Sequence, residues 1–128
     1  MFALVVRFEL LPGAEAAFDA LVAEAVPAIG TGEPGTLGYV THTVHDSPGS
    51  RVFYELYRDR AAWEAHERHE PTARFLEAVS QHLAAPPRVE FLTPARATGL
   101  GGVVTDAAPG LPVPQGADAV RPREEPAP

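Results

Sequence analysis

The chain has 128 residues, the length of one domain, and a formal net charge of −7. Its ten basic residues are all arginines and form no basic patch, which argues against a nucleic acid partner. The absence of cysteine excludes disulfides, thiolate nucleophiles and cysteine metal sites. Residues 1–13 lack a basic start and a long apolar run, so they predict neither a signal peptide nor a membrane span. We therefore expect a soluble, cytoplasmic protein.

The first third of the chain predicts a strand and then a helix. Residues 2–10 are apolar at every even position and mixed at the odd positions, which is the pattern of a strand with one dry face. Pro12-Gly13 ends this strand. From Ala14 onward, apolar residues recur at helical spacing. Pro27 is expected to end or kink the helix near Val26.

Two further strands are predicted as a hairpin. Residues 36–45 are rich in β-branched and aromatic side chains. Residues 51–59 alternate again, with aromatic or apolar side chains on both faces. The segment between them, Asp-Ser-Pro-Gly-Ser, predicts a tight connection with Pro48-Gly49 at its turn.

The next segment predicts two helices and a last strand. Residues 60–69 form a short helix, and residues 71–83 carry an apolar stripe at helical spacing. Pro71 suits the first turn of a new helix, where its missing N–H is not needed. A break is therefore expected between His69 and Pro71. Residues 88–94 then predict a strand.

The element order β-α-β-β-α-β predicts a ferredoxin-like α+β fold, with helices on one face of a four-stranded antiparallel sheet. The other sheet face then lacks a cover within residues 1–95. Because residues 2–10 and 51–59 carry apolar or aromatic side chains on both faces, a second copy packed sheet against sheet is the expected cover.

The C-terminal segment, residues 96–128, differs from the rest in composition. It is rich in proline and glycine and has few large apolar residues. Such a composition predicts a disordered tail, with an arm bound along a partner as the alternative.

Residues 2–95 carry a series of short motifs in a fixed order. The motifs are Glu33-Pro34-Gly35, Tyr39, Asp46 with Pro48, Tyr54-Glu55-Leu56-Tyr57, Ala62 to His66, and Thr72 to Phe75. Each motif is weak alone, and their common order makes the resemblance specific. With this set of motifs, residues 2–95 resemble the antibiotic biosynthesis monooxygenase (ABM) domain.

This resemblance implies a dimeric α/β barrel and the oxygenation of a quinol- or anthrone-like aromatic by dioxygen, without metal or flavin, as in polyketide biosynthesis. In such chemistry an enzyme base removes a substrate proton, and the resulting anion reduces dioxygen. Haem-degrading relatives carry an Asn and a ligating His where Val6 and Leu76 stand here, which argues against haem. Two alternatives stay open: an aromatic polyketide cyclase or dehydratase, and a non-catalytic small-molecule-binding dimer.

His66 and His42 are the leading acid/base candidates. His66 shares a helix face with His69, but His-Glu-Arg-His is one residue short of the zinc motif, so we expect no metal. His69 is interpreted as a helix-end residue, where a positive charge is favoured. His66 either borders the pocket or fixes the kinked helix to the sheet. His42 lies mid-strand between two threonines, as a general base or as a half-exposed strand residue.

An aromatic wall is expected around the substrate, with plain core packing as the alternative role. Its predicted members are Trp63, Tyr39, Tyr54, Tyr57 and Phe75.

Arg7 and Glu55 are charges placed within strands. Arg7 is a candidate for binding an enolate or phenolate, or for a place at the dimer interface. Glu55 is interpreted as structural, and it would pair with Arg7 if both lay on the same buried face.

Overall fold

The computed structural model describes residues 1–99 and 122–123. The helices are α1 (Glu15–Gly32), α2 (Arg60–Arg68) and α3 (Glu70–Val79), followed by a 3-10 turn, η1 (Ser80–His82). The strands are β1 (Phe2–Glu9), β2 (Thr36–Val44), β3 (Ser47–Tyr57), β4 (Arg88–Leu92) and the two-residue β5 (Pro122–Arg123).

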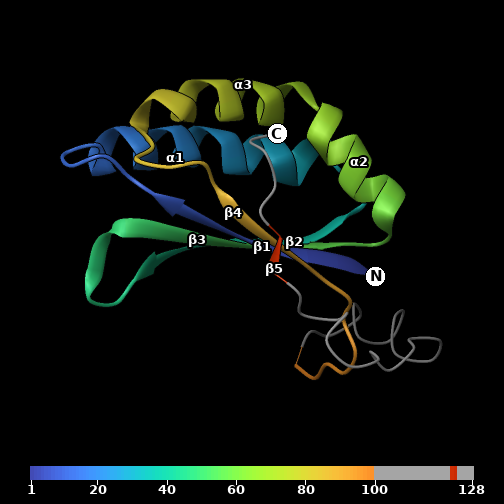
Figure 1. Cartoon of the computed structure of the whole chain (residues 1–128). Coiled ribbons are helices and arrows are strands. Elements are labelled where there is room, and N and C mark those ends of the chain that lie inside the picture. The colour runs from blue at the N-terminus through green and yellow to red at the C-terminus, as the bar shows by residue number, and fades with distance from the viewer. Residues whose placement is uncertain (100–121, 124–128) are drawn as a thin grey trace.

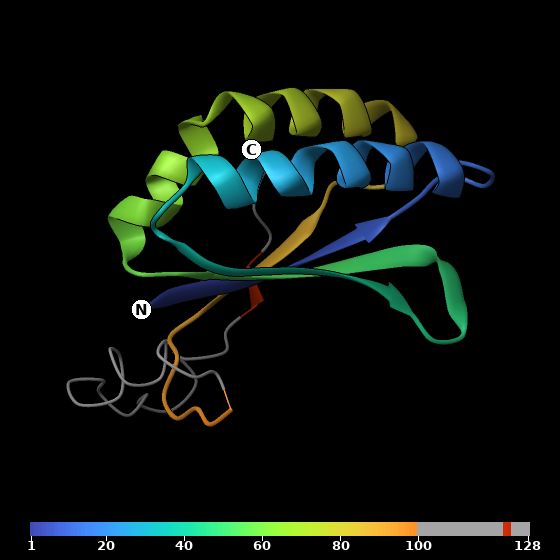
Figure 2. The same ribbon diagram turned by 180° about the vertical axis from the view of Figure 1, so that it is seen from behind.

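The strands form one antiparallel sheet in the order β2-β3-β1-β4-β5. All three α-helices lie on the same face of this sheet, with α1 and α3 side by side and α2 at one end (Figure 1). The view from behind shows the same two layers, with the tip of the β2–β3 hairpin at the end of the molecule away from α2 (Figure 2). The predicted ferredoxin-like α+β arrangement is confirmed.

The core lies between the sheet and the helices. The even positions Leu4, Val6 and Phe8 of β1 are buried on the helix-facing side, as their alternation predicts. The Phe8 ring meets Phe18 of α1 and Phe53 of β3, with ring centroids 5.2 and 4.8 Å apart. These aromatic contacts fix α1 above the centre of the sheet.

Helix α1 continues past Pro27 to Gly32, so the expected end near Val26 is wrong. Pro27 is exposed, and the carbonyl that loses its hydrogen bond there can be solvated. Ile29, two residues further on, is only 2 % exposed and anchors the last turns against the core. Burial of the helical stripe therefore outweighs the local cost of proline.

The hairpin turn also differs from the prediction. It falls at His45-Asp46, and Pro48 and Gly49 belong to β3. Asp46 adopts a left-handed conformation with φ 61°, which aspartate tolerates better than most residues. A register irregularity between Thr43 and Val44 accommodates the proline beside the turn.

The predicted break between the second and third helices is confirmed. His69 is extended (φ −66°, ψ 133°) and separates α2 from α3, and Pro71 lies in the first turn of α3. Asp59 caps α2, because its side chain accepts a hydrogen bond from the Ala62 N–H at 2.8 Å. The break turns the end of α2 toward the end of α1.

Most of the segment for which a tail or an arm was expected, residues 96–128, lies outside the described residues. Its described strand, β5, pairs with β4 of the same chain at the edge of the sheet. Among the described residues, no helix is both long and apolar enough to cross a membrane.

Candidate active site

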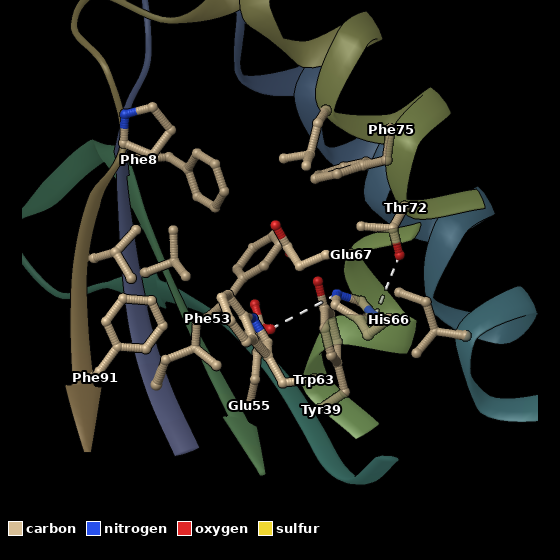
Figure 3. Close-up of a pocket in the computed structure, with 16 residues that line it drawn as sticks. Phe8, Tyr39, Phe53, Glu55, Trp63, His66, Glu67, Thr72, Phe75 and Phe91 are labelled. Carbon is tan, nitrogen blue, oxygen red and sulfur yellow. Dashed lines mark hydrogen bonds and ion pairs between the residues drawn. The ribbon is translucent and has the colours of Figure 1, made fainter. Parts of the chain in front are cut away.

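A cavity of about 130 Å³ lies between the helix-facing side of the sheet and helices α2 and α3. Most of its wall is apolar and comes from all three helices and from strands β1, β2, β3 and β4. Figure 3 shows that His66 and Glu55 lie together at one end, away from Phe8 and Phe75. The wall residues that carry a polar group are Tyr39, Glu55, Trp63, His66, Glu67 and Thr72.

The His66 side chain is held by the carboxylate of Glu33, which lies between α1 and β2. Its Nδ1 lies 2.8 Å from Oε1 of Glu33 and 3.1 Å from Oε2. The Nδ1 of His69 lies 2.7 Å from Oε2 of the same carboxylate, and the Thr36 hydroxyl donates to Oε1 at 2.7 Å. The hydroxyl oxygen of Thr72 is 3.2 Å from the His66 Nδ1. Glu33 is thus the common acceptor for two imidazoles and one hydroxyl.

Two glycines allow this approach between α1 and α2. A Cβ added at Gly35 would lie 2.6 Å from the Cβ of Ala62, and one at Gly32 would lie 2.8 Å from the His69 ring. The Gly35 carbonyl also accepts a hydrogen bond from the Arg58 N–H at 3.0 Å. The backbone at Gly32 and Gly35, on either side of Glu33, therefore lies too close to His69 and α2 for any residue with a Cβ.

The charge states follow from burial and from these hydrogen bonds. Burial alone would raise the pKa of Glu33, but hydrogen bonds from Thr36 and the two histidines, together with attraction to His66, hold it below its usual value. Burial lowers the pKa of His66, although Glu33 opposes this shift. At neutral pH, Glu33 is ionised and His66 is neutral. Because a carboxylate only accepts, Nδ1 of His66 carries the proton and Nε2 has the lone pair.

The lone pair on the His66 Nε2 is directed toward a second carboxyl group, that of Glu55. The His66 Nε2 is 3.7 Å from Oε1 of Glu55, as the dashed line in Figure 3 marks. The Tyr57 hydroxyl donates to this Oε1 at 2.6 Å. The Tyr57 and Tyr39 rings stand against the His66 ring with centroids 5.3 and 5.5 Å away. The imidazole is therefore fixed in plane and in tautomer.

Trp63 contributes the aromatic end of the cavity. Its ring centroid lies 5.3 Å from that of Phe2 and 5.2 Å from that of Phe91. Its indole N–H is buried and has no hydrogen-bond partner among the described residues. A buried donor without a partner is costly, so a ligand oxygen at this point would satisfy it.

The structure brings most of the residues predicted for the site together. His66, Trp63, Tyr39 and Phe75 line the cavity. Tyr57 is fully buried behind Glu55 and reaches the site through its hydroxyl.

Three other predicted site residues lie elsewhere. His42 is exposed on β2, its Nδ1 is 2.8 Å from the Val52 carbonyl, and it borders a separate hollow beside α1. Arg7 lies on the sheet face without helices, and there its guanidinium meets Glu9 at 2.6 Å. Tyr54 occupies that same face, one residue out of phase with Glu55. Arg7 and Glu55 are on opposite faces and do not pair.

Glu33 and Glu55 are the residues whose place in the site sequence reasoning missed. Glu33 belongs to the Glu-Pro-Gly motif, and the spacing of His66 and His69 on one helix face would let both bind a single acceptor. Glu55 alternates with Phe53 and Tyr57 on an apolar strand face, which is an unusual place for a carboxylate. No group of three or more His, Cys, Asp or Glu side chains in residues 1–99 is arranged to hold a metal ion.

The fold and the enclosed polar end define a small α+β domain with a ligand-sized cavity. The family model for antibiotic biosynthesis monooxygenases matches residues 1–79. The chain belongs to this family.

Solved structures with the same fold support this assignment. A crystal structure described as an antibiotic biosynthesis monooxygenase is 25 % identical, with a TM-score of 0.69, covering 74 % of this chain and 99 % of the other. Rv0793 from Mycobacterium tuberculosis is 26 % identical, with a TM-score of 0.71, covering 77 % and 98 %. PA3566 from Pseudomonas aeruginosa is 25 % identical, with a TM-score of 0.64, covering 71 % and 90 %. Curated proteins yield no significant match to this chain.

Proposed function

We propose that this protein is a cofactor-independent monooxygenase that oxidises a quinol-like aromatic with dioxygen. The observation that carries the proposal is the neutral His66, whose Nδ1 faces the Glu33 carboxylate at 2.8 Å and whose Nε2 faces a buried cavity. An imidazole oriented by a carboxylate is a suitable general base. Membership in a monooxygenase family supports the choice of dioxygen as the second substrate.

The chemistry needs only groups present in the chain. The His66 Nε2 takes the proton of a substrate hydroxyl, and the Glu33 carboxylate stabilises the imidazolium that forms. The substrate anion then supplies the electrons that reduce dioxygen. The buried indole N–H of Trp63, which has no hydrogen-bond partner among the described residues, is our candidate donor to an anionic substrate oxygen. The apolar walls keep water away and strengthen both interactions.

The size of the cavity favours a one-ring quinol over a polycyclic anthrone. An engineered protein cavity of about 150 Å³ holds one benzene molecule. The cavity here is about 130 Å³, and the polar groups of His66 and Glu55 lie together at one end of it (Figure 3). A single aromatic ring with a hydroxyl at that end matches both features, whereas further rings would have to extend through the opening.

We also propose that the protein is a homodimer. The sheet face without helices carries Val40, a large apolar side chain that is 48 % exposed. Val40 pairs with Tyr54 across β2 and β3 on this same face. A second copy, packed sheet against sheet, would cover both.

Oxygen uptake tests the function. The purified protein, treated with a metal chelator, is mixed with hydroquinone, 1,4-naphthohydroquinone or anthrone in an oxygen electrode cell. We expect uptake above that of heat-denatured protein, with the highest kcat/KM for the one-ring substrate. Conversion of such a substrate without oxygen uptake would favour a cyclase or dehydratase, and tight binding without turnover would favour a binding protein.

A further inference from the structure

Glu55 is a buried carboxyl group with no cationic side chain paired to it in the described part of the chain. It is 5 % exposed, and among the described residues it makes an ion-pair contact only with the neutral His66. An ionised carboxylate in such a place would be strongly disfavoured. A protonated acid costs far less to bury, and it has a proton to give.

The groups around Glu55 add negative charge to this environment. Burial raises the pKa of Glu55 to about 8, the Tyr57 hydrogen bond lowers it in part, and the charges of Glu67 and Glu33 raise it further. The neighbouring titratable groups are Tyr57 on β3, Tyr39 on β2, His66 and Glu67 on α2, and Glu33 between α1 and β2. Burial also raises the pKa of both tyrosines, so neither is charged near neutral pH.

We propose that Glu55 is a second catalytic residue, the acid that protonates the oxygen reduced in the reaction while His66 acts as the base. The Tyr57 hydroxyl donates to Oε1, which leaves Oε2 as the oxygen suited to carry the proton. The His66 Nε2 is 3.7 Å from Oε1, so one substrate can contact both groups. A base and an acid held in opposite protonation states at one cavity end can serve two proton transfers.

This role rests on the proposed oxygenase function. In the reaction sequence below, every proton that is taken up is also released. The His66 Nε2 takes the hydroxyl proton, and the anion transfers an electron to dioxygen. Recombination of the resulting radical pair forms a C–O bond and a peroxide anion on the ring. Glu55 gives its proton to the terminal peroxide oxygen, which makes a hydroperoxide. For a substrate that carries hydrogen on this carbon, loss of that hydrogen as a proton and cleavage of the O–O bond give a carbonyl and water. The proton held by His66 returns to Glu55.

The test compares Glu55→Gln with wild type in oxygen uptake across pH. The amide keeps an acceptor for Tyr57 but cannot act as an acid. We expect the wild-type kcat to fall above about pH 8, as Glu55 ionises. The variant should lose about 10²- to 10⁴-fold in kcat and lack this fall. Glu77→Gln, the same change on the exposed side of α3, should match wild type.

A second readout does not depend on activity. Folded Glu55 holds its proton up to about pH 8, whereas the unfolded chain releases it near the ordinary value of 4.5. Between these values, rising pH therefore lowers the stability of wild type relative to Glu55→Gln. Glu55→Asp retains an acid and should retain the fall in kcat at high pH.

The outcomes separate the two proposals. A wild type that consumes no oxygen with any of the three substrates overturns the oxygenase function, and the role of Glu55 with it. An active wild type whose Gln variant is equally active at every pH overturns only the assignment of Glu55. If Glu55→Gln does not fold, an active Asp variant without the high-pH fall overturns that assignment in its place.

Discussion

Glu9 on β1 and Glu55 on β3 lie on opposite faces of one sheet, and their carboxyl groups differ in charge state. Hydrogen bonds from Ser50 and Arg7 lower the pKa of Glu9 on the face without helices. Burial raises the pKa of Glu55 to about 8 on the helix-covered face. On the face without helices, the polar side chains form hydrogen bonds with each other. On the helix-covered face, the polar side chains line a cavity. We therefore propose that the chemistry takes place under the helices and that the subunit contact lies on the other side.

Of the substitutions that test this comparison, His66→Ala is expected to have the largest effect on activity. Loss of the general base should lower kcat for oxygen uptake by about 10²- to 10⁴-fold. Arg7→Gln, on the opposite face, and His42→Ala, on the edge strand, should leave kcat unchanged. Circular dichroism must show that each variant is folded. A loss in Arg7→Gln as large as that in His66→Ala would contradict the division between the faces.

Glu33→Gln is expected to have a smaller effect, because Glu33 positions His66 without touching the substrate. The carboxylate raises the pKa of His66, so its removal should move the acid limb of the pH–rate profile to lower pH. The loss of a charged acceptor for buried donors should also reduce the free energy of unfolding by about 1–3 kcal/mol. An unmoved acid limb would show that Glu33 is only structural. His69→Ala should change activity less, since Thr36 and His66 still bind Glu33.

Gly35→Ala tests the close approach that brings Glu33 to α2. The new Cβ would lie 2.6 Å from that of Ala62, so we expect a loss of about 1–3 kcal/mol in the free energy of unfolding. Gly30→Ala is the matched control, because a Cβ there meets nothing within 4 Å and alanine favours the helix. Urea denaturation of both variants measures the difference. Equal stability of the two would mean that the approach at Gly35 is not tight.

The smallest effect concerns the face without helices. Light scattering should report twice the chain mass of 13.6 kDa for wild type. Val40→Arg places a charge on the proposed contact and should shift the protein toward the monomer without unfolding it. A monomeric wild type at micromolar concentration would contradict the proposed dimer.

The fold was predictable because periodic patterns decide it. The alternation of residues 2–10 and the proline after His69 located a strand and a helix break. Predictions from local signals were wrong where contacts in the folded chain outweighed them. Helix α1 continues past Pro27 because Ile29 is buried in the core. The hairpin turn forms at Asp46, before Pro48-Gly49.

The site was less predictable, because it depends on which distant side chains meet. His66 and Trp63 were found from their spacing and from the family motifs. Glu33 is 33 residues before His66, and no periodicity links the two. Whether Arg7 and Glu55 lie on the same face of the sheet depends on the register between β1 and β3. In this register, Arg7 pairs with Val52 and Leu4 pairs with Glu55. Sequence alone did not fix that register.

The most direct test of the central claim is the pH dependence of kcat/KM for oxygen uptake in wild type and in His66→Ala. A neutral His66 acting as the base predicts that wild-type kcat/KM falls on the acid side with an apparent pKa below 6.5. The residual activity of His66→Ala should then lack this acid limb. An acid limb at the same pH in both proteins would show that another group is the base and would contradict the account.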